Sequence, residues 1–289
     1  MTLGLWLPIE AVWRAKPALV DQERLARRAE ELGFAALWMR DIPLRDPDFA
    51  DVGSVHDAFV YLAWLAAHTK TIALATGAIA LPLRHPLHVA KAAASVDQLS
   101  RGRLILGIAT GDRESEFPAF GKRRVDAPAE LRDALVAIHG AARSAERGPD
   151  VVPKPVAQRL PIVVAGNAGQ TIDWIAENAD GWITWPRTPQ HQRALVVTWR
   201  EAVARLAPGT HKPIATALYL DLATDPDLAP WPIRLGIRVG RNRLLPIVEE
   251  LEASGLDHVV LNLGPGHRPA ADVLEELGEH IARRFPPHT

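Results

Sequence analysis

The stretch that decides the fold covers residues 74–111, LATGAIALPLRHPLHVAKAAASVDQLSRGRLILGIATG. It begins with a β-prone apolar run that ends in Thr76–Gly77 and continues through a helix-like run after Pro86. It closes with a second β-prone run that ends in Thr110–Gly111. A strand, a helix and another strand in this order are typical of one crossover of a parallel sheet. The stretch therefore predicts an α/β fold in which two strands end in the same Thr-Gly pair.

The same alternation continues along the whole chain. The predicted strands are Leu3–Leu7, Ala36–Met39, Thr71–Thr76, Leu104–Ala109, Ile162–Ala165, Gly181–Thr184, Ile214–Leu220 and His258–Asn262. The predicted helices are Asp21–Leu32, Val55–His68, Pro86–Leu99, Ala127–Ala145, Thr171–Asn178, Gln190–Arg205, Asn242–Ala253 and Ala271–Arg284. Since no linker or change of composition divides the chain, these pairs predict a single (β/α)8 TIM barrel over residues 1–289. Periodicity does not reveal closure, so an open doubly wound sheet is the alternative.

Two segments are longer than a minimal barrel requires. They are GDRESEFPAFGKRRVDAPAE at residues 111–130, after the fourth strand, and ATDPDLAPWPIRLGIRVG at residues 223–240, after the seventh. The loops that follow the carboxyl ends of barrel strands carry function in enzymes of this fold. Both insertions are therefore expected to form lids or pocket walls. The alternative is that they are surface segments without a role at the site.

The composition favours a small-molecule ligand over a macromolecule. The chain has 33 Lys and Arg against 34 Asp and Glu, so its net charge does not favour nucleic acid or an anionic membrane as a partner. It has no cysteine, which excludes disulfides, thiolate metal sites and cysteine nucleophiles. The segment MTLGLWLPIE at residues 1–10 lacks the features of a signal peptide, and no apolar run is long enough for a membrane span. A cytoplasmic location is therefore expected.

The strongest binding pattern is VVAGNAGQT at residues 163–171. An apolar strand ends there in Gly-Asn-Ala-Gly and a helix follows, so backbone N–H groups would face a ligand above the barrel. This pattern predicts an anion site, most simply for a phosphate. The alternative is an ordinary turn in which Asn167 or Thr171 only caps the helix.

Other chemistries have weaker support. His85 and His88 stand three residues apart but lack a third ligand nearby, so no metal site is predicted. No G-x-S-x-G nucleophile elbow occurs, and GNAG departs from the dinucleotide pattern G-x-G-x-x-G. Trp185 ends a predicted strand and is expected in a pocket wall.

Two segments resemble a known family. Residues 76–112, TGAIALPLRHPLHVAKAAASVDQLSRGRLILGIATGD, resemble strand three, helix three and strand four of the bacterial luciferase-like flavin-dependent oxidoreductases, with the signature D-Q-L-S-x-G-R-x-x-x-G-I. Residues 161–185, PIVVAGNAGQTIDWIAENADGWITW, are similar to the family's phosphate-binding strand five and helix five, followed by strand six. The resemblance implies barrel closure and a flavin cofactor, and it is loose beyond Thr188.

The resemblance also implies roles for particular residues. Next to Thr76, the Gly77–Ala78 bond would be a non-prolyl cis peptide that presses on the central ring of the flavin. Thr110 and Gly111 would lie near the ribityl chain. The flavin phosphate and the surrounding pocket would be bordered by Ala165, Gly166, Asn167, Ala168, Gly169, Thr171 and Trp185.

The chain departs from the family at two positions. Light-emitting members have a His pair after strand two, where this chain has Arg40 and Asp41, so the aldehyde monooxygenation of true luciferases is not expected. Arg40 and Asp41 are the predicted catalytic residues: Arg40 would bind an anionic substrate or a reduced anionic flavin, with Asp41 holding it. A structural ion pair is the alternative. Thr110 replaces the basic residue that some members use for the phosphate, and Arg113 is expected to substitute for it.

These features predict a luciferase-like monooxygenase that uses reduced FMN and O2 on a small organic substrate. A flavin reductase or a nicotinamide would supply the electrons. The alternatives are deazaflavin-dependent hydride transfer, with GKRRV at residues 121–125 as a site for a polyglutamate tail, a non-catalytic flavin-binding protein, and a barrel hydrolase without flavin. The resemblance further implies a homodimer, for which Val55–His68 has an apolar stripe.

Overall fold

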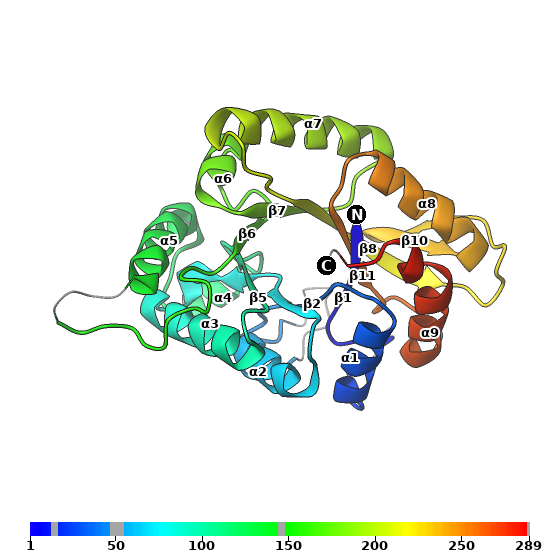
Figure 1. Ribbon diagram of the computed structural model, residues 1–289, viewed down its shortest axis with the longest axis horizontal. Helices are drawn as coiled ribbons and strands as arrows, with labels where there is room; N and C mark the ends of the chain where they lie inside the picture. The colour runs from blue at the N-terminus through cyan, green and yellow to red at the C-terminus, as the bar shows by residue number, and fades with distance from the viewer. Residues whose placement is uncertain (13–16, 47–54, 144–147, 288–289) are drawn as a thin grey trace.

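The computed structural model describes residues 1–12, 17–46, 55–143 and 148–287, and in it parallel strands form a closed barrel (Figure 1). Its strands are β1 (Thr2–Trp6), β2 (Ala36–Met39), β3 (Ala73–Thr76), β5 (Leu104–Ala109), β6 (Ile162–Ala165), β7 (Gly181–Thr184), β8 (Ile214–Leu222) and β11 (His258–Asn262). The last strand, β11, pairs with both β1 and β8, which closes the sheet. The predicted (β/α)8 barrel is therefore confirmed, and the open sheet is excluded.

The helices that surround the barrel lie close to their predicted positions. They are α1 (Gln22–Glu31), α2 (Ala58–His68), α3 (Pro86–Ser100), α5 (Ala127–Ala142), α6 (Ile172–Asn178), α7 (Pro189–Leu206), α8 (Arg241–Ala253) and α9 (Ala270–His280). Helix α2 begins at Ala58 rather than Val55 because Asp57 caps its first turn. The end of the predicted helix Ala127–Ala145 includes residues 144 and 145, which lie outside the described residues.

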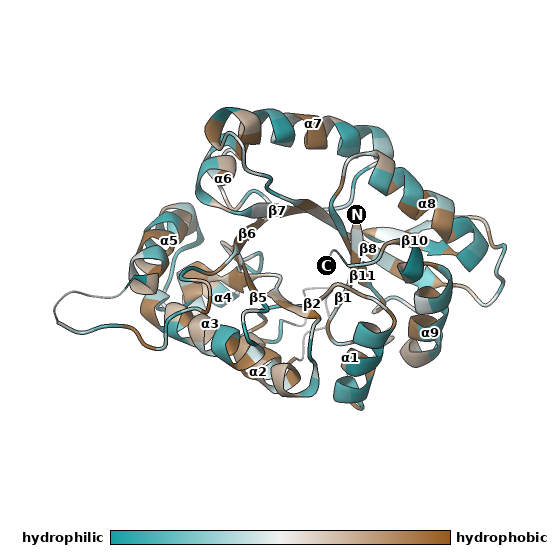
Figure 2. Cartoon of the chain, in the orientation of Figure 1, coloured by the Kyte–Doolittle hydropathy of each residue, from teal (hydrophilic) through white to brown (hydrophobic). Residues whose placement is uncertain are grey.

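The strands are buried on both faces. One face packs against the helices, and the other fills the barrel interior. The interior side chains are Trp6, Ala36, Trp38, Ala75, Val163, Ile183, Ala215, Ala217 and Val260. Figure 2 shows brown strands at the centre and teal on the outer helices. Burial on both faces explains why the strands form continuous apolar runs in the sequence.

Both insertions follow the carboxyl ends of barrel strands, as predicted. The first forms the short helix α4 (Glu116–Ala119) and a 3-10 turn, η2 (Arg124–Asp126). The second forms a hairpin, β9 (Trp231–Ile233) and β10 (Gly236–Val239), that the sequence analysis did not predict. Strand β10 runs parallel to the end of β8, which extends β8 beyond its predicted end.

A half-buried histidine, His258, lies at the amino-terminal end of the barrel. Trp38 Nε1 donates to His258 Nε2 at 3.0 Å, and His258 Nδ1 lies 2.7 Å from Thr2 Oγ1. Because an indole nitrogen only donates, His258 Nε2 is the acceptor and Nδ1 carries the hydrogen. Gly4 leaves room for the ring, since a Cβ there would lie 2.6 Å from His258 Nε2. Burial lowers the pKa of His258 from 6.5 to about 4.

This histidine is expected to make the fold sensitive to acid. Unfolded chains protonate His258 near pH 6.5, but folded chains only near pH 4, so its stabilisation is complete above pH 6.5 and is lost as the pH falls to 4. At about 1.4 kcal/mol for each pH unit, the loss is about 3 kcal/mol. Urea unfolding from pH 8 to pH 4 should show a steeper loss for wild type than for His258→Gln, whose amide oxygen can still accept from Trp38. Equal slopes would contradict this role.

Candidate functional site

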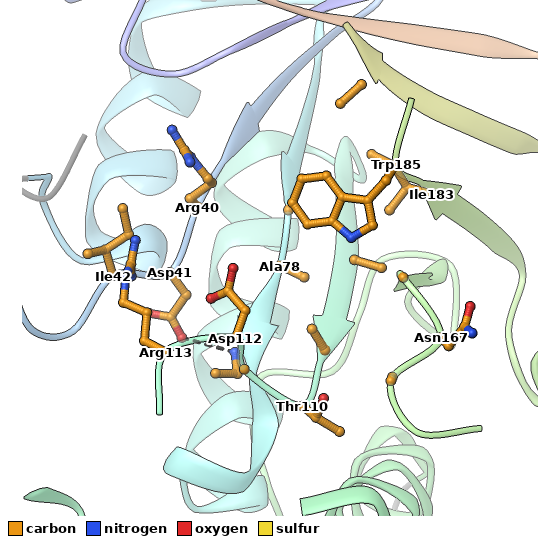
Figure 3. A pocket seen from close by; sticks show the side chains of 18 of the residues that line it. Arg40, Asp41, Ile42, Ala78, Thr110, Asp112, Arg113, Asn167, Ile183 and Trp185 are labelled. Atoms are coloured by element: carbon orange, nitrogen blue, oxygen red, sulfur yellow. Dashed lines mark hydrogen bonds between the residues drawn. The ribbon is translucent and has the colours of Figure 1, made fainter. Parts of the chain in front are cut away.

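An open cavity of about 280 Å³ lies at the carboxyl ends of the barrel strands (Figure 3). Its wall is built from the ends of the strands and the segments that follow them. The predicted site residues that line the cavity are Arg40, Asp41, Gly77, Ala78, Thr110, Gly111, Arg113, Ala165, Gly166, Asn167, Ala168 and Trp185. Residues that are far apart in the sequence therefore meet at the edge of the barrel where this fold carries its sites.

Thr76, a predicted cofactor-binding residue, is fully buried and does not line the cavity. Its Oγ1 donates to the Gly107 carbonyl and accepts from the Gly107 N–H, both at 2.8 Å. A Cβ on Gly107 would lie 1.8 Å from the Thr76 carbonyl oxygen, so glycine alone allows this approach of β3 to β5. In the Thr-Gly pair, the threonine joins two strands and Gly77 enters the cavity.

The part of the cavity next to β3 is formed by Gly77–Ala78 and Trp6. The peptide bond between Gly77 and Ala78 is cis, as the resemblance implied. A Cβ on Gly77 would lie 2.4 Å from Trp6 Cη2, so this segment packs directly on the indole. Trp6 is buried, and its Nε1 has no hydrogen-bond acceptor among the described residues. A buried donor of this kind, at the wall of a cavity, is suited to a ligand.

The turn after β6 borders the other side of the cavity. Gly166 and Ala168 have φ angles of +60° and +48°. Within the described residues, no backbone carbonyl accepts from the N–H groups of Asn167, Ala168 or Gly169. Backbone amides that converge in such a turn form a concave site for an anion. Trp185 is 49% exposed, and its ring projects between Arg40 and Asn167 (Figure 3).

Gly169 and Thr171, also predicted to bind the cofactor, support this turn and are not among the residues that line the cavity. A Cβ on Gly169 would lie 2.5 Å from Pro128 Cγ, so the glycine allows the turn to pack on α5. Thr171 Oγ1 accepts from the N–H of Trp174 at 3.1 Å and caps α6. Capping by Thr171 was the alternative that the sequence left open.

Asp41 holds Arg84, whereas the sequence analysis predicted that it holds Arg40. Arg84 Nη2 and Nε donate to the two Asp41 carboxylate oxygens at 2.7 Å and 3.0 Å. The N–H of Ala80 donates to the same carboxylate at 3.2 Å. The Asp41 side chain is 2% exposed. Asp41 therefore anchors the segment that follows Gly77–Ala78.

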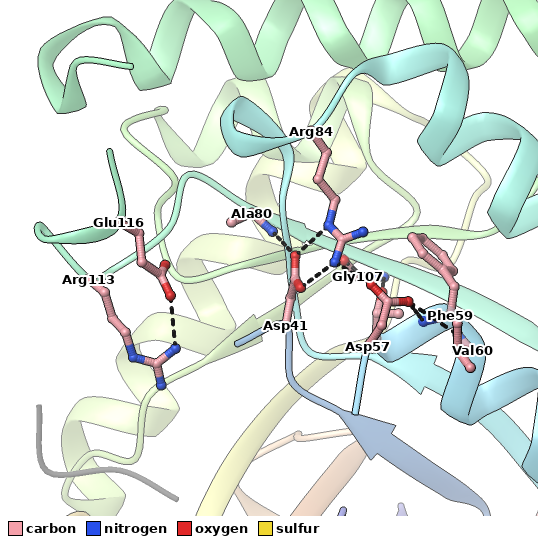
Figure 4. A network of polar contacts seen from close by, with 10 residues as sticks. Asp41, Asp57, Phe59, Val60, Ala80, Arg84, Gly107, Arg113 and Glu116 are labelled. Atoms are coloured by element: carbon pink, nitrogen blue, oxygen red, sulfur yellow. Dashed lines mark hydrogen bonds and ion pairs between the residues drawn. The ribbon is translucent and has the colours of Figure 1, made fainter. Parts of the chain in front are cut away.

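Arg84 also joins this loop to the start of α2 (Figure 4). Its Nη2 donates to Asp57 Oδ2 at 2.8 Å, while Asp57 Oδ1 accepts from the N–H groups of Phe59 and Val60. Burial of Asp57 opposes its charge, but the hydrogen bonds from Arg84 and these N–H groups lower the pKa of Asp57 overall. One guanidinium thus bridges two carboxylates on different elements.

Arg40 and Arg113 occupy the same side of the cavity as Ile42, away from Asn167 (Figure 3). The Arg40 guanidinium carbon lies 5.8 Å from the centre of the Trp6 ring. Arg113 is buried and donates to Glu116 at 3.4 Å. Its predicted contact with a flavin phosphate stays a prediction.

Glu116 is the carboxylate that faces Arg113 at the cavity wall. Burial raises the pKa of Glu116, although the positive charge of Arg113 opposes this effect. The first insertion therefore contributes a buried ion pair to the wall.

The sequence analysis missed part of the wall. The additional lining residues are Trp6, Ile42, Ala80, Ala109, Asp112, Glu116, Arg124, Ile183, Thr184, Ala217 and Tyr219. Trp6 and Thr184 stand at strand ends, so their position was a usable signal. Glu116 and Arg124 belong to the first insertion, where no pattern predicted which side chains turn inward.

Comparison with known proteins agrees with this geometry. The family model for luciferase-like monooxygenases matches residues 1–229. The chain belongs to the luciferase-like monooxygenase family.

Curated relatives of this luciferase-like chain match it in part. An uncharacterized protein of Mycobacterium tuberculosis is 33% identical over 188 residues, which cover 56% of this chain and 66% of the relative. The alkanal monooxygenase alpha chain of Photorhabdus luminescens is 34% identical over 98 residues, 34% of this chain and 26% of that relative. The chain thus spans less than two thirds of either relative.

Solved structures share the fold over nearly the whole chain. A monooxygenase, RslO1, from Streptomyces bottropensis has a TM-score of 0.79 and 20% identity, and the match covers 99% of this chain and 100% of that one. An F420-dependent secondary alcohol dehydrogenase in complex with an F420-acetone adduct has a TM-score of 0.77 and 15% identity, with 97% and 98% covered. At these identities the structures support the luciferase-like fold alone.

In the described ranges, no helix has the length and apolar character that crossing a membrane requires.

Proposed function

We propose that this luciferase-like protein is a flavin-dependent oxidoreductase that uses reduced FMN and O2 to oxygenate a small organic substrate. One observation carries the proposal: the Gly77–Ala78 segment, Trp6 and the turn at Gly166 border a single cavity. A flat platform for the ring and an anion-binding turn for the phosphate are two elements that a flavin mononucleotide needs.

The residues present fit such a cofactor. The N–H groups of Asn167 and Ala168 would hold the phosphate, Thr110 would contact the ribityl chain, and Trp6 and Gly77–Ala78 would face the ring. When bound, a reduced flavin supplies the electrons with which O2 is activated.

The protein itself would supply a positive charge and would exclude water from the ligand. Arg40 lies over Trp6, so its positive charge would stabilise a reduced anionic flavin or an anionic substrate. Asp41 is committed to Arg84 and Ala80, so its role is to position the loop rather than to move protons. Trp185 would cover the ligand and exclude water.

Deazaflavin-dependent hydride transfer is the second candidate. The shared fold of an F420-dependent alcohol dehydrogenase and the presence of Arg124 in the wall favour it. The other cations of the basic run are engaged elsewhere, since Lys122 pairs with Glu130 and Arg123 with Asp126. Because a polyglutamate tail needs several cations, FMN remains the first choice.

A titration of the purified full chain tests the proposal. Oxidised FMN, anaerobically reduced FMN and F420 are added in turn, and binding is followed by absorbance and fluorescence. We expect reduced FMN to bind at least about tenfold more tightly than the other two. Preference for F420 would replace the proposal with hydride transfer, and binding of neither would overturn it. Tight binding without faster reoxidation in air would indicate a flavin-binding protein without catalysis.

Two partners complete the proposal. A separate flavin reductase would deliver reduced FMN. A second copy of the chain would pack on α2, where Val60 and Trp64 are 68% and 39% exposed, in support of the homodimer.

A further inference from the structure

A buried indole lies behind the turn that borders the cavity after β6. Trp182 is 2% exposed, and its Nε1 donates to the Gly166 carbonyl at 2.7 Å. The N–H of Gly166 donates to the Ile183 carbonyl at 2.9 Å. Both polar backbone groups of Gly166 are therefore bonded to β7, and the turn cannot rotate at its first residue without breaking one of these hydrogen bonds.

Trp182 holds the turn from the side that faces the helices. Its side chain packs in the core between strands and helices, whereas Ile183 belongs to the barrel interior and lines the cavity. In a trans peptide unit the C=O and the N–H point in opposite directions. The Gly166–Asn167 bond is trans, and its carbonyl points to Trp182. The Asn167 N–H therefore points away from the helices, to the side of the cavity that Asn167 lines.

Gln170 holds the next two peptide units of the turn. Its backbone N–H donates to the Asn167 carbonyl at 2.8 Å, and its Nε2 donates to the Ala168 carbonyl at 3.1 Å. Arg132 Nη1 donates to Gln170 Oε1 at 3.0 Å. Since a guanidinium only donates, Oε1 faces Arg132 and Nε2 faces the turn. Three consecutive carbonyls thus accept from donors behind the turn, and the N–H groups of the same peptide units point the opposite way.

The indole of Trp182 is itself fixed in one orientation. Its ring centre lies 5.4 Å from that of Trp199, at an interplanar angle of 46°. Trp199 is fully buried, and its Nε1 donates to the Lys212 carbonyl at 2.9 Å. Because buried aromatic rings are closely packed, Trp182 cannot turn away from Gly166 without displacing Trp199.

We propose that Trp182 and Gln170 are positioning residues for the flavin phosphate. They hold the carbonyls of the turn so that its N–H groups meet the phosphate, and they thereby set a preference for FMN over riboflavin. Neither side chain lines the cavity, so both act through the backbone. This inference rests on the proposed function, because it concerns the phosphate part of the same site.

The expected effect is specific to the phosphate. N–H groups that already point at the ligand need no reordering when it binds, and this preorganisation increases affinity. Without the donors of Trp182 and Gln170, the peptide units of the turn are free to rotate. The flavin ring contacts Gly77–Ala78 and Trp6 instead, so its part of the binding should not change.

The test compares FMN with riboflavin, which has the same ring and ribityl chain but no phosphate. Both are reduced anaerobically and titrated into the purified full chain. We expect wild type to bind FMN at least about a hundredfold more tightly, because hydrogen bonds to a charged group are strong. In Trp182→Phe, which keeps an aromatic ring but loses the Nε1 donor, this preference should fall at least about tenfold. The affinity for riboflavin should stay within about threefold of wild type.

Gln170→Met gives a second test that does not alter the buried core. Methionine has nearly the length of glutamine but no amide, so the Ala168 carbonyl loses its side-chain donor. The preference for FMN should fall at least about threefold, again with little change for riboflavin. This variant decides the matter if Trp182→Phe does not fold. A merely structural role would lower stability, or both affinities together, without changing their ratio.

Trp199→Phe is the matched control. It also removes the N–H of a buried indole that donates to a backbone carbonyl, but that carbonyl belongs to Lys212 and not to the turn. Its preference for FMN should stay within about twofold of wild type. An unchanged preference in Trp182→Phe and Gln170→Met, or an equal loss in Trp199→Phe, would overturn the inference. A wild type that binds neither flavin would overturn the proposed function instead, and equal binding of both flavins would overturn the phosphate site together with this inference.

Discussion

Replacement of Gly166 by aspartate is expected to abolish binding of reduced FMN while the barrel stays folded. Gly166 has a φ of +60°, which aspartate and asparagine tolerate better than other side chains. A Cβ there meets only Trp185 Nε1, at 3.7 Å, so there is space for the new side chain. Its carboxylate would face the phosphate, and two like charges about 5 Å apart repel by about 3 kcal/mol at an effective dielectric of 20. The affinity should fall by at least about a hundredfold.

Gly166→Asn is the matched control, because it has nearly the same shape without the charge. It should keep affinity within about fivefold of wild type, and both variants should unfold at similar urea concentrations. Anaerobic titration with reduced FMN measures the difference. If the aspartate variant binds as tightly as the asparagine variant, the phosphate does not lie at the turn after β6.

Replacement of Arg84 by methionine is expected to destabilise the fold strongly. The Asp41 side chain is 2% exposed, and without Arg84 its charge would keep only the hydrogen bond from the Ala80 N–H. Loss of one partner from a buried ion pair costs about 3–5 kcal/mol, because the remaining charge is left uncompensated. The free energy of unfolding, measured in urea, should fall by about that amount. FMN affinity should also fall, since Ala80 follows the Gly77–Ala78 segment.

Two further variants separate this effect from a simple loss of packing. Asp41→Asn combined with Arg84→Met should recover at least about half of the lost stability, because a neutral amide removes the uncompensated charge. Arg123→Met, which breaks the exposed pair with Asp126, should leave unfolding unchanged. An Arg84→Met variant as stable as Arg123→Met would show that Asp41 does not depend on its partner.

The elements that the sequence predicted best are those whose pattern is local. Leu104–Ala109, Ile162–Ala165 and His258–Asn262 form strands with the predicted bounds, because apolar residues between helices signal a strand buried on both faces. Gly33 and Gly255 adopt φ angles of +88° and +90°, the left-handed conformation with which glycine commonly closes a helix. The hairpin of β9 and β10 was not predicted, because its strands are short and because Pro232 in β9 is typical of a loop.

In the candidate site too, features set by neighbouring residues were predicted and contacts between distant residues were not. The Gly166–Ala168 turn was predicted from a local motif, and the cis Gly77–Ala78 bond was implied by the family resemblance. The pairing of Asp41 with Arg84 was not predicted, because the partners are 43 positions apart and Arg40 stands next to Asp41 in the sequence. Trp6 was missed although it ends β1, and its contact with Gly77 joins segments that are far apart in the chain.

The sequence by itself determined most of the strands and helices, the family resemblance and the edge of the barrel where the candidate site residues gather. These follow from the period of apolar residues and from short motifs, which are properties of neighbouring residues. Tertiary structure alone decided which charges meet: Asp41 with Arg84, Arg113 with Glu116, and Asp221 with His267. Closure of the barrel brings strand ends together regardless of their separation in the chain, and burial then makes each charge depend on whichever partner lies within reach.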